Sequence, residues 1–372
     1  MPIPRRVVLG GCAILIVCIA TFVAVEVVFR LLLFSEVGFM QRFRSPDLYG
    51  IWDSDDNYWK LYYLFGGRFT PPEHPHPQLG WVGTFSTKTY LHNDAHRVGN
   101  KVPILLYGDS FAECSTIADK RDCFQGIVNG DPQLGQRFFL LNYGVGGYGV
   151  DQMYLLLKAS LSYYDNPFVV VGIMTQDLDR SALSVRIGQK PYFGIERGQL
   201  ILKGVPVDQE PRKFFSENPP RIVSYLARMW ANTDSRFTRV RRLILGTEEQ
   251  KNIKITVNEK IILEMVAELK QRGIPHLFLI FYPDWVYDDP ADWREEFLRS
   301  VFEEHQIPYL STKEIIWEDA RKMGEHPKEY YYDSHPTARA YQLLTQVLKA
   351  HIMAQFNENH PVPMEAGAMG SP

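Results

Sequence analysis

The stretch Pro103–Cys114, "PILLYGDSFAEC", decides the fold. Four apolar residues lead into Gly-Asp-Ser, and the chain then becomes polar. An apolar run of this length that ends at a turn is typical of a strand buried in a sheet. Gly108 allows the chain to turn tightly, and the Asp109 side chain can cap or brace the turn. The pattern therefore predicts a buried strand that ends at Ser110 and a helix that begins close behind it.

Comparable apolar runs recur along the chain and alternate with helical patterns. The further runs are Phe138–Leu141, Phe168–Ile173, His276–Phe281 and a weaker one at Pro308–Leu310. The helical stretches are Val150–Ser162, Val257–Arg272, Asp292–His305 and Thr337–Ala354. Fully apolar strands separated by helices indicate a parallel sheet that is covered on both faces. The predicted fold class is α/β, with three layers and a doubly wound, mostly parallel sheet of about five strands.

The composition is that of a packed globular protein, because 45% of the 372 residues are apolar and 22% are charged. The net charge is −3 at pH 7, and no long basic run occurs. Nucleic acid is therefore not expected as a partner.

The N-terminal stretch Val7–Val25, "VVLGGCAILIVCIATFVAV", carries no charge. As a helix it would span about 28 Å, which is close to the thickness of the hydrocarbon core of a bilayer. Its length and the lack of a clear cleavage site favour an uncleaved single-pass anchor over a signal peptide. Glu26 and Arg30 follow at i,i+4 spacing and can pair where the helix leaves the bilayer. A short tail before the helix and a large domain after it favour placing that domain outside the cytosol, in the periplasm or an equivalent space.

We expect the chain to divide into an anchor at 1–34, an irregular collar rich in aromatic residues at 35–100, an α/β domain at 101–356 and a disordered tail at 357–372. The α/β domain contains an insertion at 181–250. In this insertion we predict a hairpin that turns at Arg197-Gly198, followed by a basic helical stretch at Ser235–Gly246.

Polar residues gather where the predicted strands end, which is where open α/β sheets bind their ligands. Ser110 follows the first strand, and the glycine-rich segment 140–152, "LLNYGVGGYGVDQ", ends the second. The third strand ends in Thr175, Gln176 and Asp177. The glycines match neither a dinucleotide nor a Walker pattern, so a phosphate site is the remote alternative.

The segment "YYYDSHPTARAYQLL" places Asp333 and His335 just before the last helix. A histidine base needs a neighbouring group that fixes its tautomer and stabilises its imidazolium form. Asp333 is the nearby carboxylate, and a backbone carbonyl is the other candidate for this role. His74 and His76 lie among prolines in "PEHPHP" without further ligands nearby, so we interpret them as loop residues and expect no metal site.

These motifs, in this order, resemble those of the GDSL/SGNH hydrolases, and most of all the bacterial membrane-anchored members. The resemblance implies that Ser110 is the nucleophile and His335 the base, with Asp333 orienting the base. It also implies an oxyanion hole made by the N–H groups of Ser110 and Gly147 and the side-chain amide of Gln176. Gly144 is the alternative to Gly147, and Gly108, Asp109 and Asp177 are expected to support the site.

The chain departs from the family pattern at two positions. Gln176 stands where the family usually has asparagine, and Asp333 precedes the histidine by two residues where three are more common. The resemblance implies a serine esterase or an O-acyltransferase that works through an acyl-enzyme on O-acylated carbohydrate of the cell envelope, without a cofactor. The alternative is a catalytically degenerate domain that binds glycans.

Cys114 and Cys123 follow the Gly-Asp-Ser motif at a short distance. In an oxidising compartment they can close a disulfide loop beside the site, and two free thiols are the equal alternative.

Overall fold

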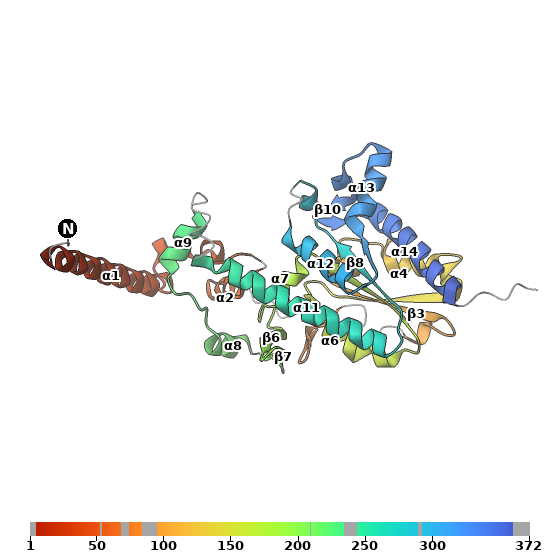
Figure 1. The fold of residues 1–372 in the computed structure, drawn as a ribbon, viewed down its shortest axis with the longest axis horizontal. Helices are drawn as coiled ribbons and strands as arrows, with labels where there is room; N and C mark the ends of the chain where they lie inside the picture. Colours follow the sequence, from red (N-terminus) through yellow and green to blue (C-terminus); the bar gives the residue numbers. More distant parts are fainter. Residues whose placement is uncertain are drawn as a thin grey trace, which may run out of the picture. The chain divides into compact units, whose positions relative to one another are not determined.

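The computed structural model describes residues 5–52, 54–67, 74–83, 95–208, 210–233, 244–288 and 292–359 (Figure 1). The chain divides into two units. Unit 1 comprises Met1–Trp81 and Asp179–Asn258, and unit 2 comprises Val82–Leu178 and Glu259–Pro372.

Unit 2 is built on a five-stranded sheet in which every pair of neighbours is parallel. The strands lie in the order β4-β3-β5-β8-β9. Their bounds are β3 Val102–Gly108, β4 Phe138–Gly144, β5 Phe168–Met174, β8 His276–Phe281 and β9 Tyr309–Ser311. Because every residue of β4, β5 and β8 is buried, these strands need the continuous apolar sequences that predicted them. The predicted fold class, a parallel α/β sheet of five strands, is confirmed.

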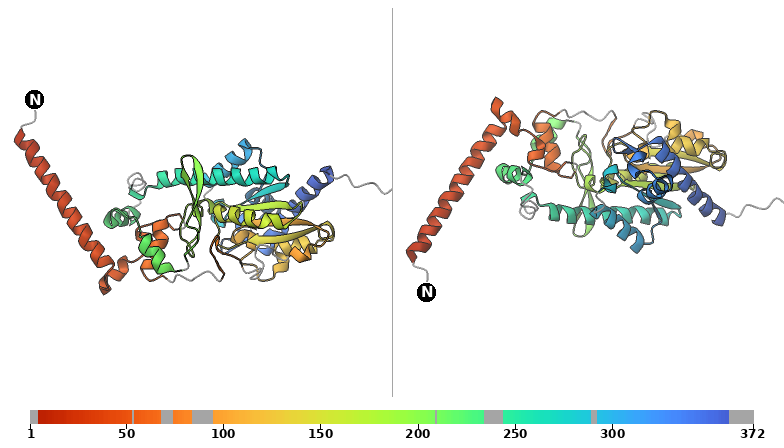
Figure 2. Two further views of the ribbon diagram at one scale, coloured as in Figure 1. Left: turned by 90° about the horizontal axis from the view of Figure 1, so that it is seen from below. Right: turned by 90° about the horizontal axis from the view of Figure 1, so that it is seen from above.

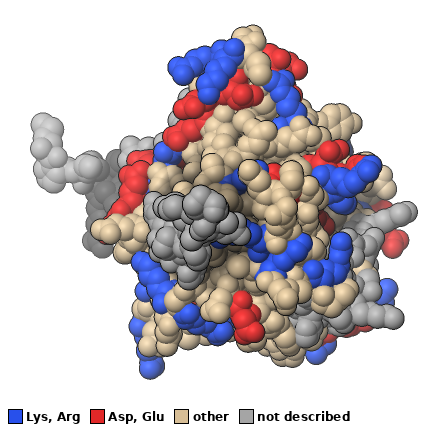
Figure 3. All heavy atoms as spheres, turned by 90° about the vertical axis from the view of Figure 1, so that its right-hand side faces the viewer, with Lys and Arg blue, Asp and Glu red and all other residues tan. Residues whose placement is uncertain are grey.

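Helices cover both faces of this sheet (Figures 1 and 2). On one face α4 and α14 pack together, and on the other a hydrogen bond between Tyr154 and Glu264 joins α6 to α11. Acidic and basic side chains are interspersed over the part of the surface that Figure 3 shows. The helices are α3 Ser110–Glu113, α4 Phe124–Gly130, α5 Leu134–Arg137, α6 Val150–Ser160, α7 Asp177–Arg180, α11 Thr247–Gln271, α12 Trp293–Glu304, α13 Thr312–Met323 and α14 Ala338–Asn359.

The edge strand β4 is covered by side chains from α4. The Asn129 side chain donates to the carbonyl of Leu140 at 3.0 Å and accepts from its N–H at 2.7 Å. The N–H of Asn142 donates to Oε1 of Gln125 at 3.2 Å. These amide side chains satisfy outward-facing backbone groups that an edge strand otherwise presents to a second strand.

Unit 1 contains helices, 3-10 turns and short hairpins. The β6–β7 hairpin turns at Arg197-Gly198, as predicted. The helix α2, which begins at its cap Asp55, was not predicted from the sequence. The elements are α1 Arg5–Leu33, η1 Gly38–Phe43, η2 Pro46–Leu48, α2 Asp56–Leu64, β1 Pro75–His76, β2 Gly80–Trp81, β6 Tyr192–Glu196, β7 Gln199–Lys203, α8 Pro211–Glu217 and α9 Tyr225–Thr233.

The helix α1 contains a segment, Leu9–Leu33, that is long and apolar enough to cross a membrane, with a mean hydropathy of 2.8. A signal sequence has the same properties, so length and hydropathy alone do not separate the two. Most of the predicted basic stretch Ser235–Gly246 lies outside the described residues. Of the predicted tail at 357–372, the described residues include only the end of α14, at Asn359.

Candidate active site

Three glycines lie side by side near the carboxyl end of the sheet. Gly108 of β3 is in register with Gly144 of β4 and with Gly172 of β5. A Cβ atom on Gly108 would lie 2.5 Å from the Cβ of Ala112, and one on Gly144 would lie 2.3 Å from the backbone nitrogen of Glu113. Real side chains do not approach this closely, so the glycines allow α3 to lie directly against the sheet. This close packing fixes the position of the serine that begins α3.

Ser110 is the first residue of α3, and Asp109 is its cap. Oδ1 of Asp109 accepts from the N–H of Phe111 at 2.9 Å, and Oδ2 lies 3.3 Å from Oγ of Ser110. The Asp109 side chain is fully buried, while Ser110 is half-buried. The predicted support from Gly108 and Asp109 therefore takes the form of close packing and a helix cap.

His335 is brought to Ser110 by a small hairpin. The strands β10 Tyr331–Tyr332 and β11 His335–Pro336 pair antiparallel, and the two residues between them, Asp333 and Ser334, have φ angles of 47° and 59°. A two-residue turn with both φ angles positive has the geometry of a type I′ turn. The structure places Nε2 of His335 3.0 Å from Oγ of Ser110, across 225 positions of sequence. The two residues that the sequence predicted as nucleophile and base are thus in hydrogen-bond contact.

The other ring nitrogen of His335 is held by the main chain. Nδ1 lies 2.8 Å from the backbone carbonyl oxygen of Asp333. The Asp333 side chain is exposed, and within the described part of the chain its carboxylate makes no hydrogen bond. Of the two orienting groups considered from the sequence, the structure places the backbone carbonyl against the ring. Because a carbonyl only accepts, Nδ1 carries the proton and Nε2 is left as the acceptor for the serine hydroxyl.

The last helix, α14, is hydrogen-bonded to the segment that carries Ser110. The hydroxyl of the buried Tyr341 in α14 donates to the carbonyl of Phe111 at 2.8 Å. The ring of Phe111 lies 4.9 Å from the ring of His335. Sequence reasoning missed Tyr341, because a tyrosine on the apolar face of a helix is usually a core residue and its acceptor here is a main-chain group.

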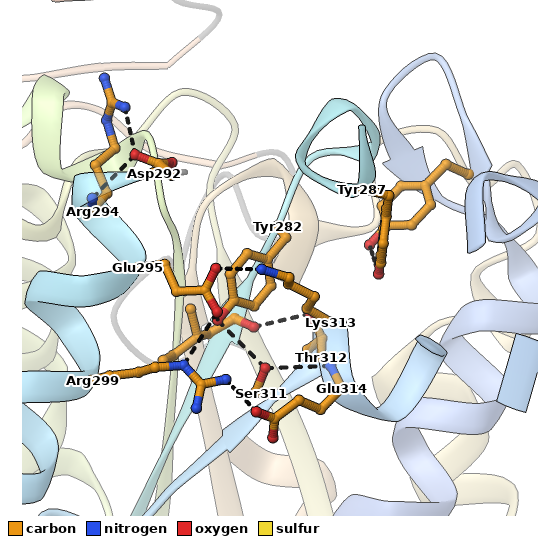
Figure 4. Close-up of polar contacts among 12 residues, drawn as sticks. Tyr282, Tyr287, Asp292, Arg294, Glu295, Arg299, Ser311, Thr312, Lys313 and Glu314 are labelled. Carbon is orange, nitrogen blue, oxygen red and sulfur yellow. Dashed lines mark hydrogen bonds and ion pairs between the residues drawn. The ribbon is translucent and has the colours of Figure 1, made fainter. Parts of the chain in front are cut away.

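Aromatic residues hold the hairpin that carries His335. Tyr287 ends the 3-10 helix η7, Asp284–Tyr287, and its hydroxyl lies 3.3 Å from that of Tyr331 in β10. The Tyr287 ring also stacks on Trp317 of α13, with ring centroids 6.0 Å apart. Figure 4 shows Tyr287 and, apart from it, a polar network that joins α12 to α13. In that network Glu295 accepts from Lys313 at 2.5 Å and from Arg299 at 3.2 Å. We interpret it as structural, because its charges pair with one another.

The two glycines considered for the oxyanion hole differ in the structure. The N–H of Gly144 donates to Oδ1 of Asn142 at 2.8 Å, and Nδ2 of Asn142 donates to the carbonyl of Ala112 at 2.7 Å. Gly144 therefore serves packing and its amide is already used, which counts against it as an oxyanion donor. Gly147 has a φ of 82°, a conformation that favours glycine. Its role as a donor stays a prediction.

Gln176 follows β5 and is half-buried. Its main-chain N–H lies 3.2 Å from the sulfur of Met174, and its side-chain amide makes no hydrogen bond to the described residues. Oδ2 of Asp177 accepts from the N–H of Met174 at 2.8 Å, which fixes the turn. The contribution of the Gln176 amide to an oxyanion hole also stays a prediction.

Cys114 and Cys123 are both buried and both are free thiols in the structure. The Cys114 thiol donates to the carbonyl of Ala112 at 3.7 Å. Burial raises the pKa of Cys114, while the neighbouring Cys114 thiol lowers the pKa of Cys123. A cavity of about 640 Å³ beside α3 is lined by Cys123, Glu113 and Asn142, among others. Among the residues that the structure describes, no group of three potential ligands could hold a metal ion.

No protein-family model and no curated protein matches the chain. Several solved structures are similar to part of the chain. One is a member of the lipolytic G-D-S-L family from Veillonella parvula, with 13% identity over 68% of this chain and 98% of that chain and a TM-score of 0.38. Two others are the acetyl xylan esterase AlAXEase, with 11% identity over 68% and 100% and a TM-score of 0.40, and a catalytic mutant of the acetylxylan esterase Axe2 from Geobacillus stearothermophilus, with 14% identity over 68% and 95% and a TM-score of 0.39.

These identities and TM-scores are low. The parallel sheet itself defines the fold, and the contact between Ser110 and His335 defines the candidate site.

Proposed function

We propose that the protein is a serine-dependent ester hydrolase or O-acyltransferase. The observation that carries this proposal is the 3.0 Å contact between Oγ of Ser110 and Nε2 of His335. The contact lies at the carboxyl edge of the parallel sheet, and the second ring nitrogen of His335 is already engaged at 2.8 Å. A hydroxyl that donates to a tautomer-fixed imidazole is the arrangement that activates a serine for attack on a carbonyl.

The proposed reaction has two halves. As Oγ of Ser110 attacks the ester carbonyl, Nε2 of His335 takes the hydroxyl proton, and the resulting imidazolium then protonates the leaving alcohol. This leaves an acyl-enzyme on Ser110. Water, or a sugar hydroxyl in a transferase, attacks the acyl group while His335 accepts its proton and returns a proton to Ser110. Throughout, the carbonyl of Asp333 holds the Nδ1–H group of His335 in place.

The negative charge of the tetrahedral intermediate needs donors. We assign these to the N–H groups of Ser110 and Gly147 and to the side-chain amide of Gln176. A donor of this kind contributes roughly 3–4 kcal/mol to the transition state in acyl-transfer enzymes. The side chain of Gln176 is one methylene longer than that of asparagine, so Gln176→Asn tests how well its amide reaches the oxyanion.

We propose O-acylated carbohydrate of the cell envelope as the substrate class, reached outside the cytosol by an enzyme that α1 anchors. Exposed aromatic side chains on the hairpin that carries His335 and on helix α13 support this. Tyr332 pairs with His335 across the hairpin and is 73% exposed, and Trp317 is 49% exposed. Flat rings with an apolar face and a polar edge suit the faces of sugar rings.

The first experiment exposes the full-length protein, in detergent, to a fluorophosphonate probe and locates the adduct by peptide mass spectrometry. We expect an adduct on Ser110 that is lost in His335→Ala, with circular dichroism to show that both proteins are folded. Acetate release from acetylated oligosaccharides, compared with acetyl transfer to an added acceptor, then separates hydrolase from transferase. If folded protein takes no adduct, while wild type and Ser110→Ala bind the same glycans equally, the chain is a degenerate glycan-binding domain.

A further inference from the structure

The last two turns of α1 are bound to the N-terminal end of α9, within unit 1. The carboxylate of Glu26 accepts from the N–H groups of Tyr225 and Leu226 at 2.8 and 3.1 Å. It also accepts from the hydroxyl of Ser224 at 2.9 Å and from Nε of Arg30 at 2.8 Å. The Glu26 side chain is almost fully buried by these partners. A carboxylate is well matched to the first N–H groups of a helix.

Arg30 and Leu33 extend this attachment. The guanidinium of Arg30 donates to the carbonyl of Ile222 at 2.8 Å and to that of Val223, and its cation lies over the ring of Tyr225. Leu33 is fully buried in an apolar cluster. The other buried members of this cluster are Met40, Tyr49, Leu61, Ile222 and Tyr225. The end of α1 therefore belongs to the folded core of unit 1.

This network marks where α1 leaves the hydrocarbon. An ionised carboxylate in the centre of a bilayer costs several kcal/mol, and charged groups near the ends of a span reach the interface instead. The apolar part of the span that precedes Glu26, Leu9–Val25, is about 26 Å long as a helix, close to the thickness of the hydrocarbon core. The position of Glu26 thus places the first residues of α9 at the boundary between hydrocarbon and headgroups.

Apolar side chains remain exposed on the elements that form this attachment or adjoin it. Val223 lies beside Arg30 and is 95% exposed, and Leu31 on α1 is 70% exposed. Further exposed side chains are Phe34 after the helix, Phe39 on η1 and Trp230 on α9. We call these five residues the juxtamembrane face. Single exposed apolar residues are ordinary, but a group that adjoins a bare apolar helix indicates contact with another apolar phase.

We propose that the juxtamembrane face lies in the headgroup region of the bilayer that α1 crosses, so that unit 1 is seated on the membrane instead of being tethered by a free linker. The occupant of this face is lipid, because Leu31 lies on α1 itself and Val223 lies beside Arg30 of α1, so that the face adjoins the exposed apolar surface of this helix. The proposal rests on the proposed anchor but is independent of the chemistry at Ser110. If α1 were cleaved as a signal peptide, Glu26 would be lost, and with it the hydrogen bonds that it accepts from Ser224, Tyr225 and Leu226.

The test uses the full chain in nanodiscs of phosphatidylcholine and phosphatidylglycerol. Cys12→Ala and Cys18→Ala remove the exposed thiols, and Val223→Cys carries a bimane label. The matched control is Arg197→Cys, at the exposed turn of the β6–β7 hairpin. We expect a lipid bearing a nitroxide near its headgroup to quench the label at Val223 several-fold more than the label at Arg197, and aqueous iodide to show the reverse order.

Equal quenching of the two labels by iodide would overturn the proposal, and so would a label at Val223 that neither quencher reaches, since this would show a protein partner. Should Val223→Cys fail to fold, brominated lipid and the native Trp230 provide the same measurement. The difference in quenching between wild type and Trp230→Phe isolates that side chain, and no difference would refute lipid contact. Fluorophosphonate labelling of Ser110 in the same samples reports the proposed function separately.

Discussion

The Nδ1 atom of His335 is held by a main-chain carbonyl, and this arrangement has a chemical consequence. A carbonyl fixes the tautomer as well as a carboxylate does, but it carries no net charge and stabilises the imidazolium less. The carboxylate of Asp333 points to solvent, so its charge is screened by water. What the site requires of this residue is its backbone position in the turn.

We therefore expect Asp333→Asn to keep activity within a few-fold of wild type. Asparagine tolerates the positive φ of 47° at this position and retains the carbonyl that contacts His335. In a triad that depends on the carboxylate, the same change lowers kcat by about 10⁴. Steady-state hydrolysis of a p-nitrophenyl ester measures the difference, with His335→Ala as the inactive control. A loss as large as that of the control would show that the Asp333 side chain takes part.

The two thiols beside α3, of Cys114 and Cys123, lead to a second prediction. Because the pKa of Cys123 is lowered and that of Cys114 is raised, Cys123 has the larger thiolate fraction at any given pH below both values. We expect iodoacetamide to modify Cys123 before Cys114 in the folded Cys12→Ala, Cys18→Ala protein, as followed by peptide mass spectrometry. In urea the preference should disappear. A disulfide-linked peptide in a non-reducing digest would favour the bridged alternative instead.

Among the elements, the sequence predicted best the strands whose residues are buried on both faces of the sheet. The strand β8 occupies the predicted range His276–Phe281, because its residues are buried on both faces. The helix α11 begins ten residues before the predicted Val257, since its first turns are polar and show no apolar stripe. The contact of Ser110 with His335 could be predicted from motif order. The use of the Asp333 carbonyl and the Tyr341 hydroxyl could not, because both depend on how distant segments pack.

The close packing of α3 against the glycines of the sheet leads to a further prediction. We expect Gly144→Ala to abolish esterase activity and to lower the free energy of unfolding by about 1–3 kcal/mol or more, because the new Cβ would meet the backbone of α3 at 2.3 Å. The control is Gly130→Ala at the end of α4, where a Cβ meets nothing within 4 Å. Urea unfolding and ester hydrolysis measure both effects. Similar behaviour of the two variants would show that α3 can move away from the sheet without consequence.

At the scale of the whole molecule, the chain passes between its two units at Trp81, Leu178 and Asn258. Ser110 and His335 belong to unit 2, while α1 and its attachment to α9 belong to unit 1. The last turns of α1 are part of the core of unit 1. The residue at which a truncated chain begins therefore decides whether this core stays folded.

We expect a variant that begins at Glu26 to keep unit 1 folded, and one that begins at Glu36 to lose much of its stability. The shorter chain lacks Leu33, whose burial alone is worth about 2–5 kcal/mol. It also lacks Glu26, whose carboxylate accepts from the first N–H groups of α9. Hydrogen exchange read by mass spectrometry separates the units. The result expected is faster exchange in 37–66 and 221–233 of the shorter chain only. Equal protection in both variants would contradict the structural role of the α1 terminus.

The side-chain amides along β4 have a consequence for the behaviour of the protein at high concentration. An uncovered edge strand is a template on which another molecule can add a strand and start a fibril. Asn129 occupies both main-chain groups of Leu140 as a neighbouring strand would, and Gln125 occupies one of Asn142. Two amide side chains thus terminate the sheet on this side and oppose the addition of a strand from another molecule, so colloidal solubility depends here on two residues of α4.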